Sequence, residues 1–267
     1  MLKQILTLCT FAMLTTAPVF AEEMAAEMAP EMAAPAESSA PVAIGGYVGA
    51  VSNYVWRGTQ QNSGAASVQG GLDLSFPAVE GLGLGLWVAS IGGGDTRNET
   101  DYYVSYEGSA GDLGYSTGLT LYSYDFSTFT TITKSGEEVN VAVQKEISLG
   151  LSYGDFGFTY YTVLADDSTY GAGDDAESSI GLDWVALSYG TSLIGMDLGV
   201  TYETGSYNQQ WVNAGNALET TAIATYSLGK SISDSTSVSF NGTKVLTNSD
   251  VGDALKNEFW MSMDLSF

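Results

Sequence analysis

The chain has 267 residues, with 31 acidic side chains against 8 basic ones and no histidine, so its formal net charge is -23 and its pI is near 4.1. This charge argues against nucleic-acid binding, because phosphate backbones require a positive surface. The lack of histidine excludes hydrolases that use imidazole as a base or as an orienting group. A glycosidase-like pair of carboxylates is the remaining enzymatic alternative. We predict no enzyme, no catalytic residue and no cofactor.

The N-terminus predicts a cleaved secretory signal peptide over residues 1–21. Lys3 precedes an apolar run at 5–14, and the small residue Ala21 suits the cleavage site. The run is shorter than the ~18 residues that a membrane-spanning helix needs. Cys9 lies inside this segment, so the mature chain is predicted to contain no cysteine and no disulfide.

Residues 22–43 consist mainly of Ala, Glu, Met, Pro and Ser, and they repeat the units EMAA, EMAP and EMAA. A segment with so few aromatic and β-branched residues does not bury enough apolar surface to fold. We therefore predict a disordered periplasmic tether at 22–43 and assign residues 44–267 to one folded domain.

From residue 44 onward, apolar residues alternate with small or polar ones, and this period of two indicates β-strands. The segment 82–88 places leucines and a valine on one face, with glycines and Trp87 on the other, and the segment 194–203 alternates in the same way. The polar face is rich in Gly and Ser, whereas a soluble sandwich would carry long charged side chains there. Strands are expected at 45–58, 66–76, 82–91, 99–108, 113–125, 140–153, 156–166, 177–189, 193–205, 217–229, 233–245 and 256–267.

Short connectors alternate with longer polar ones along this domain. Tight turns are expected at Gly111-Asp112, at Gly154-Asp155, at 190–192 and at 230–232, whereas 126–139 is a long loop. This alternation is typical of outer-membrane barrels, which must close because unpaired amides are costly in hydrocarbon. The expected fold is all-β: a closed antiparallel transmembrane β-barrel of about twelve strands, with short periplasmic turns and longer extracellular loops.

The last strand is apolar or aromatic at alternate positions, namely Phe259, Met261, Met263, Leu265 and Phe267. A terminal aromatic residue in such a strand is the expected assembly signal for the barrel assembly machinery. The predicted location is therefore the bacterial outer membrane, reached through the periplasm, with membrane lipid and lipopolysaccharide as partners.

Two stretches resemble a known family. The chain reads SNYVWRGTQQNSGAASVQGGLDLSF from Ser52 and GLWVASIGGGDTRNETDYYVSYEGSAGDLGYSTGLTLYSY from Gly85. Both are similar to the TorF porin family, the Gcw_chp domain family of bacterial outer-membrane proteins, and the SNYVWRG run is a specific feature of that match. The resemblance implies an outer-membrane porin-like protein and leaves the solute open.

Strand parity places many carboxylates on the polar face, which we expect to line the lumen. Carboxylates in a pore wall attract cations and exclude anions, so the first hypothesis is passive diffusion of small solutes with a preference for cations. Arg57 is expected either at a constriction opposite carboxylates or in a structural ion pair. The lumen and selectivity candidates are Arg57, Asp73, Asp101, Glu107, Glu146, Asp183, Asp197, Glu203, Glu219, Glu258 and Asp264.

The second hypothesis is a non-conducting structural or surface-binding barrel with a plugged lumen. Barrels near eight strands are filled by side chains and those near sixteen leave a wide pore, so about twelve lies between. This alternative expects the lumen to be filled by side chains such as Tyr103 and Tyr122, or by residues 22–43. The expected solutes are small cationic or neutral molecules, and a homo-oligomer is left open.

One acidic, Gly-containing loop lacks the ligand spacing of a known calcium loop, so no metal site is predicted. A solvated external loop is the preferred interpretation, and Mg²⁺ or Ca²⁺ bridging to lipopolysaccharide phosphate is the alternative. The residues concerned are Asp166, Asp167, Asp174, Asp175 and Glu177.

Overall fold

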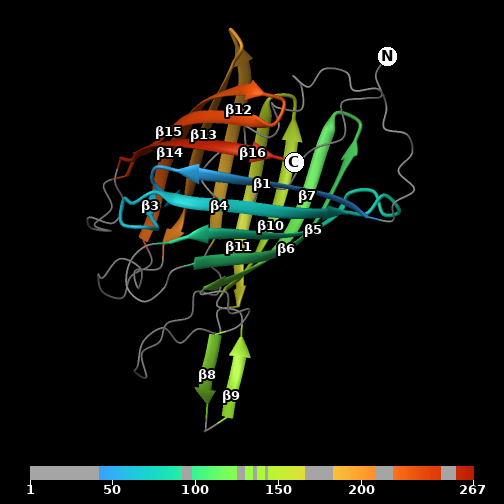
Figure 1. Ribbon diagram of the computed structural model, residues 1–267, viewed down its shortest axis with the longest axis vertical. Coiled ribbons are helices and arrows are strands. Elements are labelled where there is room, and N and C mark those ends of the chain that lie inside the picture. Colours follow the sequence, from blue (N-terminus) through green and yellow to red (C-terminus); the bar gives the residue numbers. More distant parts are fainter. Residues whose placement is uncertain are drawn as a thin grey trace.

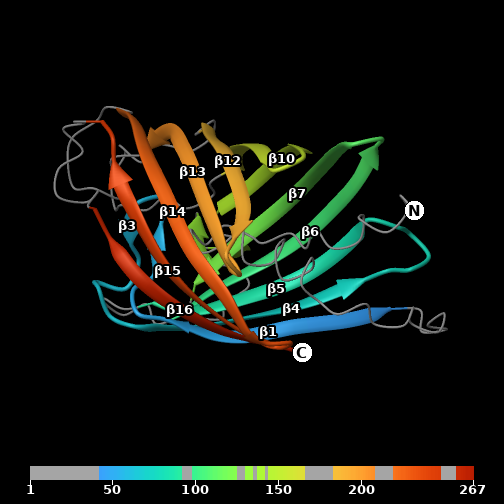
Figure 2. The ribbon, with the colours of Figure 1, turned by 90° about the horizontal axis from the view of Figure 1, so that it is seen from above.

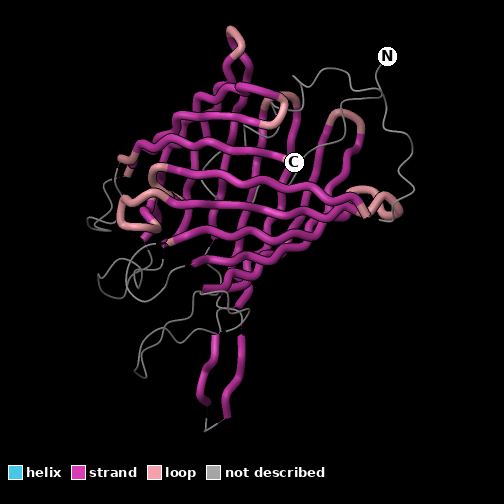
Figure 3. The backbone as a smooth tube through the Cα atoms, viewed as in Figure 1, coloured by secondary structure: helices cyan, strands magenta, loops and turns pink. Residues whose placement is uncertain are grey.

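The computed structural model describes residues 42–91, 98–124, 130–134, 137–141, 144–165, 183–207, 219–247 and 257–267; of these, 124, 130–134, 137–141, 144, 165, 206–207 and 219–220 are described by their backbone alone. The predicted signal peptide and almost all of the predicted tether lie outside these ranges. Within them, no helix is long and apolar enough to cross a membrane, and Figure 3 shows strands and loops throughout.

Twelve long strands form one closed antiparallel barrel, which confirms the expected fold class and strand number (Figure 1). Around the barrel their order is β1, β16, β15, β14, β13, β12, β11, β10, β7, β6, β5, β4 and back to β1. The strands are β1 (Ala43–Val51), β4 (Ser67–Ser75), β5 (Leu82–Ser90), β6 (Asn98–Ala110), β7 (Leu113–Tyr124), β10 (Gln144–Tyr153), β11 (Phe156–Ala165), β12 (Asp183–Leu193), β13 (Met196–Tyr207), β14 (Glu219–Ser233), β15 (Thr236–Val245) and β16 (Phe259–Ser266).

The barrel closes where the first strand meets the last, as Figure 2 shows. Tyr47 lies opposite Ser266, and the ladder continues to Val51 opposite Ser262. Beyond it, the Phe267 amide donates to the Gly46 carbonyl at 2.9 Å and the Gly46 amide donates to the Phe267 carbonyl at 3.1 Å. A closed ladder leaves no row of unpaired backbone groups, so the terminal residue helps to remove the sheet edge.

Side chains alternate between the two faces of the barrel wall as the sequence predicts. In β10, Leu149 and Leu151 point outward and are 50% and 49% exposed, whereas Glu146 and Ser148 point inward and are buried. In β16 the five assembly-signal positions all lie on the outer face and are exposed, from Leu265 at 45% to Phe267 at 75%. The outer surface is therefore apolar and the inner surface polar.

Five short turns join the strands at one end of the barrel and longer segments join them at the other, as expected. Gly111 and Gly154 have positive φ values of 66° and 55°, as tight hairpins require. Two predicted turns are misplaced, because both preceding strands continue further: β12 runs to Leu193 and β14 to Ser233. The first of these turns is Ile194-Gly195, with φ values of 58° and 68°.

Two further segments differ from the expected strands and loops. The first strand, expected to reach residue 58, ends at Val51, and a small hairpin of β2 (Val55–Trp56) and β3 (Thr59–Gln60) follows. The expected loop at 126–139 and the first two residues of the expected strand 140–153 form a second hairpin, β8 (Thr130–Lys134) with β9 (Glu137–Val141). This hairpin stands apart from the barrel in Figure 1, and the barrel strand β10 begins only at Gln144.

Candidate constriction site

The segment 52–66, hereafter the inward loop, folds into the barrel instead of extending β1. Its tip is the β2–β3 hairpin, in which Arg57 and Gly58 form a two-residue turn with φ values of 45° and 80°. This left-handed backbone suits glycine at the second position and is unfavourable for the arginine. The side-chain contacts of Arg57 must therefore help to hold the turn.

The base of the inward loop packs against the near wall of the barrel. Tyr54 and Val55 are buried with Trp87 of β5 and Trp260 of β16, and the Tyr54 and Trp87 rings meet edge to face at 5.7 Å. The Tyr54 hydroxyl donates to Glu99 of β6 at 3.0 Å. Burial of these aromatic and aliphatic side chains stabilises the inward position of the loop.

A short internal network shapes the loop between its two ends. The Gln61 amide donates to the Tyr54 carbonyl at 2.8 Å, and the Tyr54 amide donates to the Asn62 side-chain oxygen at 3.3 Å. The Asn62 side-chain amide in turn donates to the Ala65 carbonyl. Asn62 is fully buried and replaces backbone partners that an extended strand would have supplied.

The tip of the loop reaches the opposite wall. In the ring of strands, five strands separate β1 from β11 in either direction, so β11 faces β1 across the lumen. The Arg57 guanidinium lies 5.0 Å from the ring centre of Tyr161 on β11 and 5.2 Å from that of Trp184 on β12. It also forms an ion pair with Glu146 of β10, Nη1 to Oε2, at 3.0 Å. The inward loop thus crosses the lumen and narrows it.

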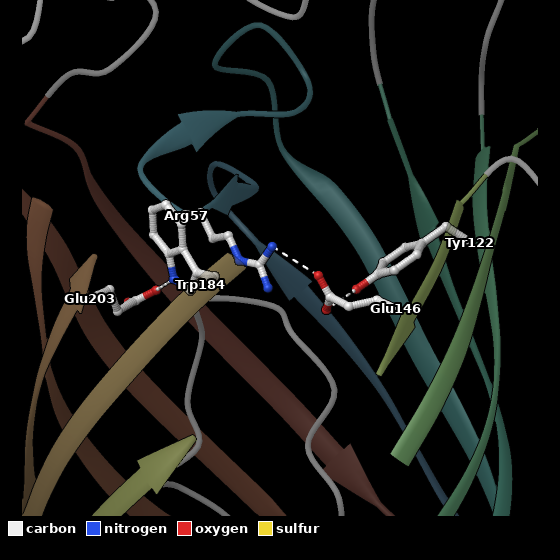
Figure 4. Close-up of polar contacts among 5 residues, drawn as sticks. All are labelled: Arg57, Tyr122, Glu146, Trp184 and Glu203. Carbon is white, nitrogen blue, oxygen red and sulfur yellow. Dashed lines mark hydrogen bonds and ion pairs between the residues drawn. The ribbon is translucent and has the colours of Figure 1, made fainter. Parts of the chain in front are cut away.

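The Arg57–Glu146 pair is buried and further supported by aromatic residues (Figure 4). The Tyr122 hydroxyl donates to the second oxygen of Glu146 at 3.2 Å, and the guanidinium lies 4.5 Å from the ring centre of Trp56. Burial by itself would lower the pKa of Arg57, but the charges and hydrogen bonds around it, above all Glu146, raise the pKa above its ordinary value. The guanidinium of Arg57 therefore keeps its positive charge at this depth of the lumen.

Three more carboxylates surround this level of the lumen. Glu99 and Asp101 of β6 are 5% and 4% exposed, and the charges of Glu99 and Glu146 act on Asp101. Glu203 of β13 accepts a hydrogen bond from the Trp184 indole at 3.0 Å and lies within electrostatic reach of Arg57 (Figure 4). Among the described inward-facing side chains at this level, carboxylates therefore outnumber cations.

A second set of candidate acids lies toward the end with the short turns. Asp73 accepts a hydrogen bond from Tyr103, whose ring covers Gly85, and Asp197 accepts one from Ser192 at 2.9 Å. Glu107 and Asp264 are half-buried and also face inward. These acids do not meet the Arg57 cluster. The wall at this end carries small residues, with serine hydroxyls lying against glycines, as at Ser116 and Gly150, Ser152 and Gly114, and Ser188 and Gly157.

The remaining candidate acids lie next to the inward loop, on the outer face of the barrel, or outside the described residues. Glu258 accepts a hydrogen bond from the Asn53 side chain at 3.2 Å and so anchors the inward loop next to β16. Asp183 was expected on the lumenal face, and this is wrong: Trp184 points inward, so Asp183 faces outward, where it accepts a hydrogen bond from Tyr160 at 2.6 Å. The side chain of Glu219 and the acidic loop with Asp166, Asp167, Asp174, Asp175 and Glu177 lie outside the described residues.

The sequence analysis missed the aromatic part of the site. Tyr54, Tyr161 and Trp184 are not among the predicted lumen residues, and the first half of the inward loop was predicted to continue the strand 45–58. One available signal was the Arg57-Gly58 dipeptide, since a glycine after a polar residue between short β-prone segments favours a two-residue turn. The opposite-wall partners have no local signal, because they follow the loop by about a hundred residues.

Comparisons with known proteins find similar solved structures and identify a family. The chain is similar to the structure of the KdgM porin, with 10% identity, a TM-score of 0.46, and coverage of 84% of this chain and 99% of that one. It is also similar to an outer membrane channel from Pseudomonas putida F1, with 12% identity, a TM-score of 0.44, and coverage of 89% and 99%. Acinetobacter baumannii OccAB3 has 13% identity and a TM-score of 0.44, with coverage of 86% and 66%.

No curated protein sequence matches the chain. The family model described as bacterial protein of unknown function (Gcw_chp) matches residues 35–262. This match covers the barrel from before β1 to within β16, including the inward loop. The chain therefore belongs to the Gcw_chp family of bacterial proteins.

Proposed function

We propose that the protein is an outer-membrane channel for the passive diffusion of small solutes, with a preference for cations. The observation that carries this proposal is a closed barrel with an apolar exterior and an acidic interior. A closed barrel satisfies its backbone without water and so suits hydrocarbon, and an acidic lumen concentrates cations.

The outer surface supports a position in a bilayer. Aromatic residues gather on the outer face near the short turns, where Tyr153 lies opposite Phe156 and Phe156 opposite Tyr189, with the last two rings 5.0 Å apart. Tyr106 and Tyr115 are exposed at the same end. An aromatic girdle at the edge of an apolar band is the pattern of a bilayer interface.

The inner surface supports a solute path up to the inward loop. Ser116, Ser152 and Ser188 face inward and are nevertheless partly exposed, so solvent reaches the wall at that level. At the inward loop, carboxyl groups outnumber the Arg57 cation among the described inward-facing side chains. A low-dielectric wall strengthens the attraction of such a region for cations and its repulsion of anions.

Reversal potentials in planar bilayers under a salt gradient test the proposal. The purified protein is expected to conduct and to show a potential of the sign that cation preference produces. A Glu80→Gln variant changes an exposed carboxylate of a short turn and should leave the reversal potential unchanged, whereas Asp101→Asn should shift it toward zero. No conductance, or a preference for anions, would refute the proposed function.

A specific observation favours a second candidate function, a barrel with a plugged lumen. The inward loop crosses the whole lumen, and Tyr122 and Trp184 fill space beside it. A plugged barrel of this kind would act as a structural or surface-binding protein. It is distinguished by the absence of conductance in the wild type together with conductance after the inward loop is removed.

Export and assembly are part of the same proposal. Cleavage after Ala21 would release the mature chain into the periplasm, and the exposed aromatic C-terminus would present the last strand to the barrel assembly machinery. Phe267 also closes the seam with Gly46. Deleting Phe267 should therefore reduce the amount of heat-modifiable barrel in outer membranes far more than deleting residues 24–36. Equal levels of the two variants would contradict this part of the proposal.

A further inference from the structure

We propose that the residues around the Arg57 guanidinium form a binding site for an organic cation, and that Arg57 occupies this site as an internal ligand while the inward loop is closed. A solute carrying a guanidinium or ammonium group would compete with Arg57 for the same residues. The identification of this ligand as a transported solute rests on the proposed function. The binding site itself stands on the geometry described below.

The chemistry of the site suits an organic cation. The guanidinium lies between aromatic rings, with the ring centre of Tyr161 at 5.0 Å and that of Trp184 at 5.2 Å, and it pairs with Glu146 at 3.0 Å. Aromatic faces combined with a carboxylate are the groups that recognise organic cations in proteins. These three residues belong to β10, β11 and β12 of the wall, so they remain in place when the loop moves.

Hydrogen bonds from and to neighbouring side chains hold Glu146 and Trp184 in place. The Tyr122 hydroxyl donates to Glu146 at 3.2 Å, and the Trp184 indole donates to Glu203 at 3.0 Å (Figure 4). Glu203 also accepts a hydrogen bond from Thr225 at 3.0 Å. Groups held by neighbours that do not touch the ligand are preorganised, which reduces the entropy cost of binding.

A third feature of the site is the buried side chain of Asp101. Asp101 is 4% exposed, and its Oδ1 has no hydrogen-bond partner among the described residues. Glu99 and Glu146 act on it electrostatically, and Arg57 is the cation paired with Glu146. A buried carboxylate oxygen without a partner is unfavourable, so a further positive group close to Asp101 would stabilise this cluster.

The backbone at the tip of the inward loop has an unfavourable conformation. Arg57 has a φ of 45°, a left-handed backbone conformation that is unfavourable for an arginine. Glycine would remove this strain, yet the position carries a cationic side chain that reaches the aromatic and acidic site. The tip therefore places a cationic side chain against backbone preference, as an internal ligand would require.

Arg57→Gly tests the inference, because it removes the guanidinium and relieves the backbone at the same time. Isothermal calorimetry in detergent micelles would measure binding of ethylguanidinium at millimolar concentration. Heat-modifiable electrophoretic mobility verifies that each variant is folded. We expect saturable binding to Arg57→Gly and at least tenfold weaker binding to the wild type, whose own arginine competes.

Three further variants identify the site. Arg57→Gly combined with Glu146→Gln should lose the binding, whereas Arg57→Gly combined with Glu80→Gln should retain it, because Glu80 lies exposed in a short turn. Arg57→Lys keeps a cation on the loop and should bind no more ethylguanidinium than the wild type. Equal binding with and without Glu146, or no saturable binding to folded Arg57→Gly, overturns the inference.

The outcomes separate this inference from the proposed function. Binding to Arg57→Gly in a protein that shows no conductance supports the site and removes its role in transport. Conductance with cation preference but without binding overturns the site and leaves the channel. If Arg57→Gly does not fold, its refolding yield with added ethylguanidinium decides: recovery supports the inference, and no recovery overturns it.

Discussion

The two ends of the barrel interior are built from the same alternating strands and yet are lined by side chains of different size. Toward the short turns, serines lie against glycines of neighbouring strands, as at Ser152 and Gly114. Toward the long connectors, the lumen is crossed by the inward loop and lined by large side chains such as Tyr122 and Trp184. Acids occur at both ends, but a buried pair with a cation is described only at the loop end.

This difference shows that lumenal acids do not share one role. Asp73 and Asp197 each accept a hydrogen bond from a neighbouring hydroxyl on the wall, and these contacts are local. Glu146 joins the wall to a loop that starts on the opposite side of the barrel. Replacing an acid at the turn end should therefore affect ion flow mildly, whereas replacing one at the loop end should affect both flow and the position of the loop.

The largest effect is expected from removing the inward loop. Val51 lies opposite Ser67, so a short Gly-Ser turn can replace residues 52–66 without changing the register of β1 and β4. Single-channel conductance should rise several-fold, because the segment that crosses the lumen is gone. Removing the β8–β9 hairpin, which stands apart from the barrel, should leave conductance unchanged. Equal conductance of the loop deletion and the wild type would show that the inward loop does not limit flow.

The next effect concerns the buried ion pair. Glu146→Gln leaves the Arg57 cation buried without its carboxylate, which should cost about 3–5 kcal/mol of unfolding free energy. Urea unfolding in lipid vesicles, followed by tryptophan fluorescence, measures this loss. Asp264→Asn is the matched change at the turn end, where no described cation is paired with the carboxylate, and it should cost much less. Similar losses for the two variants would remove the contrast between the ends.

A smaller effect is expected where an aromatic ring covers a glycine. A Cβ at Gly85 would lie 2.1 Å from the Tyr103 ring, so Gly85→Ala should displace the ring from Asp73 and destabilise the barrel by ~1–3 kcal/mol. Gly45→Ala is the control, because its Cβ would meet only an atom at 3.9 Å. Thermal unfolding followed by electrophoretic mobility compares the two. An equal shift for both would contradict the close contact at Gly85.

The smallest effect is a gain in stability at a short turn. Ile194 is 91% exposed and has a φ of 58°, which is unfavourable for a β-branched residue. Ile194→Asn should stabilise the β12–β13 turn by about 1 kcal/mol, because Asn tolerates this conformation. Ile232→Asn on the exterior of β14 is the control and should not stabilise. A lower unfolding temperature for Ile194→Asn would contradict the expectation.

Local patterns in the sequence were enough to predict the architecture. Period-two alternation defined the strands, and the alternation of short and long connectors gave the expected strand number, which the structure confirms. The outward face of the last strand was also predictable from Phe259 to Phe267, since neighbouring residues of a strand point to opposite sides. These features depend on local pattern, and local pattern is fully contained in the chain.

Strand parity predicted which face of the wall most candidate acids occupy. It did not predict their position along the barrel axis or the residues that they contact. The turn at Ile194-Gly195 came later than predicted, and the expected parity of β12 failed at Asp183, which faces outward. Where parity held, it could not distinguish Asp264, for which no described cation is a partner, from Glu146 in its ion pair. Distance along the barrel axis depends on the register between strands, and register is fixed by the whole ladder.

The entry of the inward loop into the lumen, and the residues that it contacts there, could not be predicted without the three-dimensional fold. Arg57 is distant in the sequence from its partners Glu146, Tyr161 and Trp184. Closure of twelve strands places the start of the inward loop and the strands of these partners on opposite sides of one lumen, so that the loop tip reaches them. The reason is geometric, because the width of a closed barrel sets the distance that a loop of this length can span. The chain encodes the arginine, and the closed barrel supplies the aromatic and acidic wall that binds it.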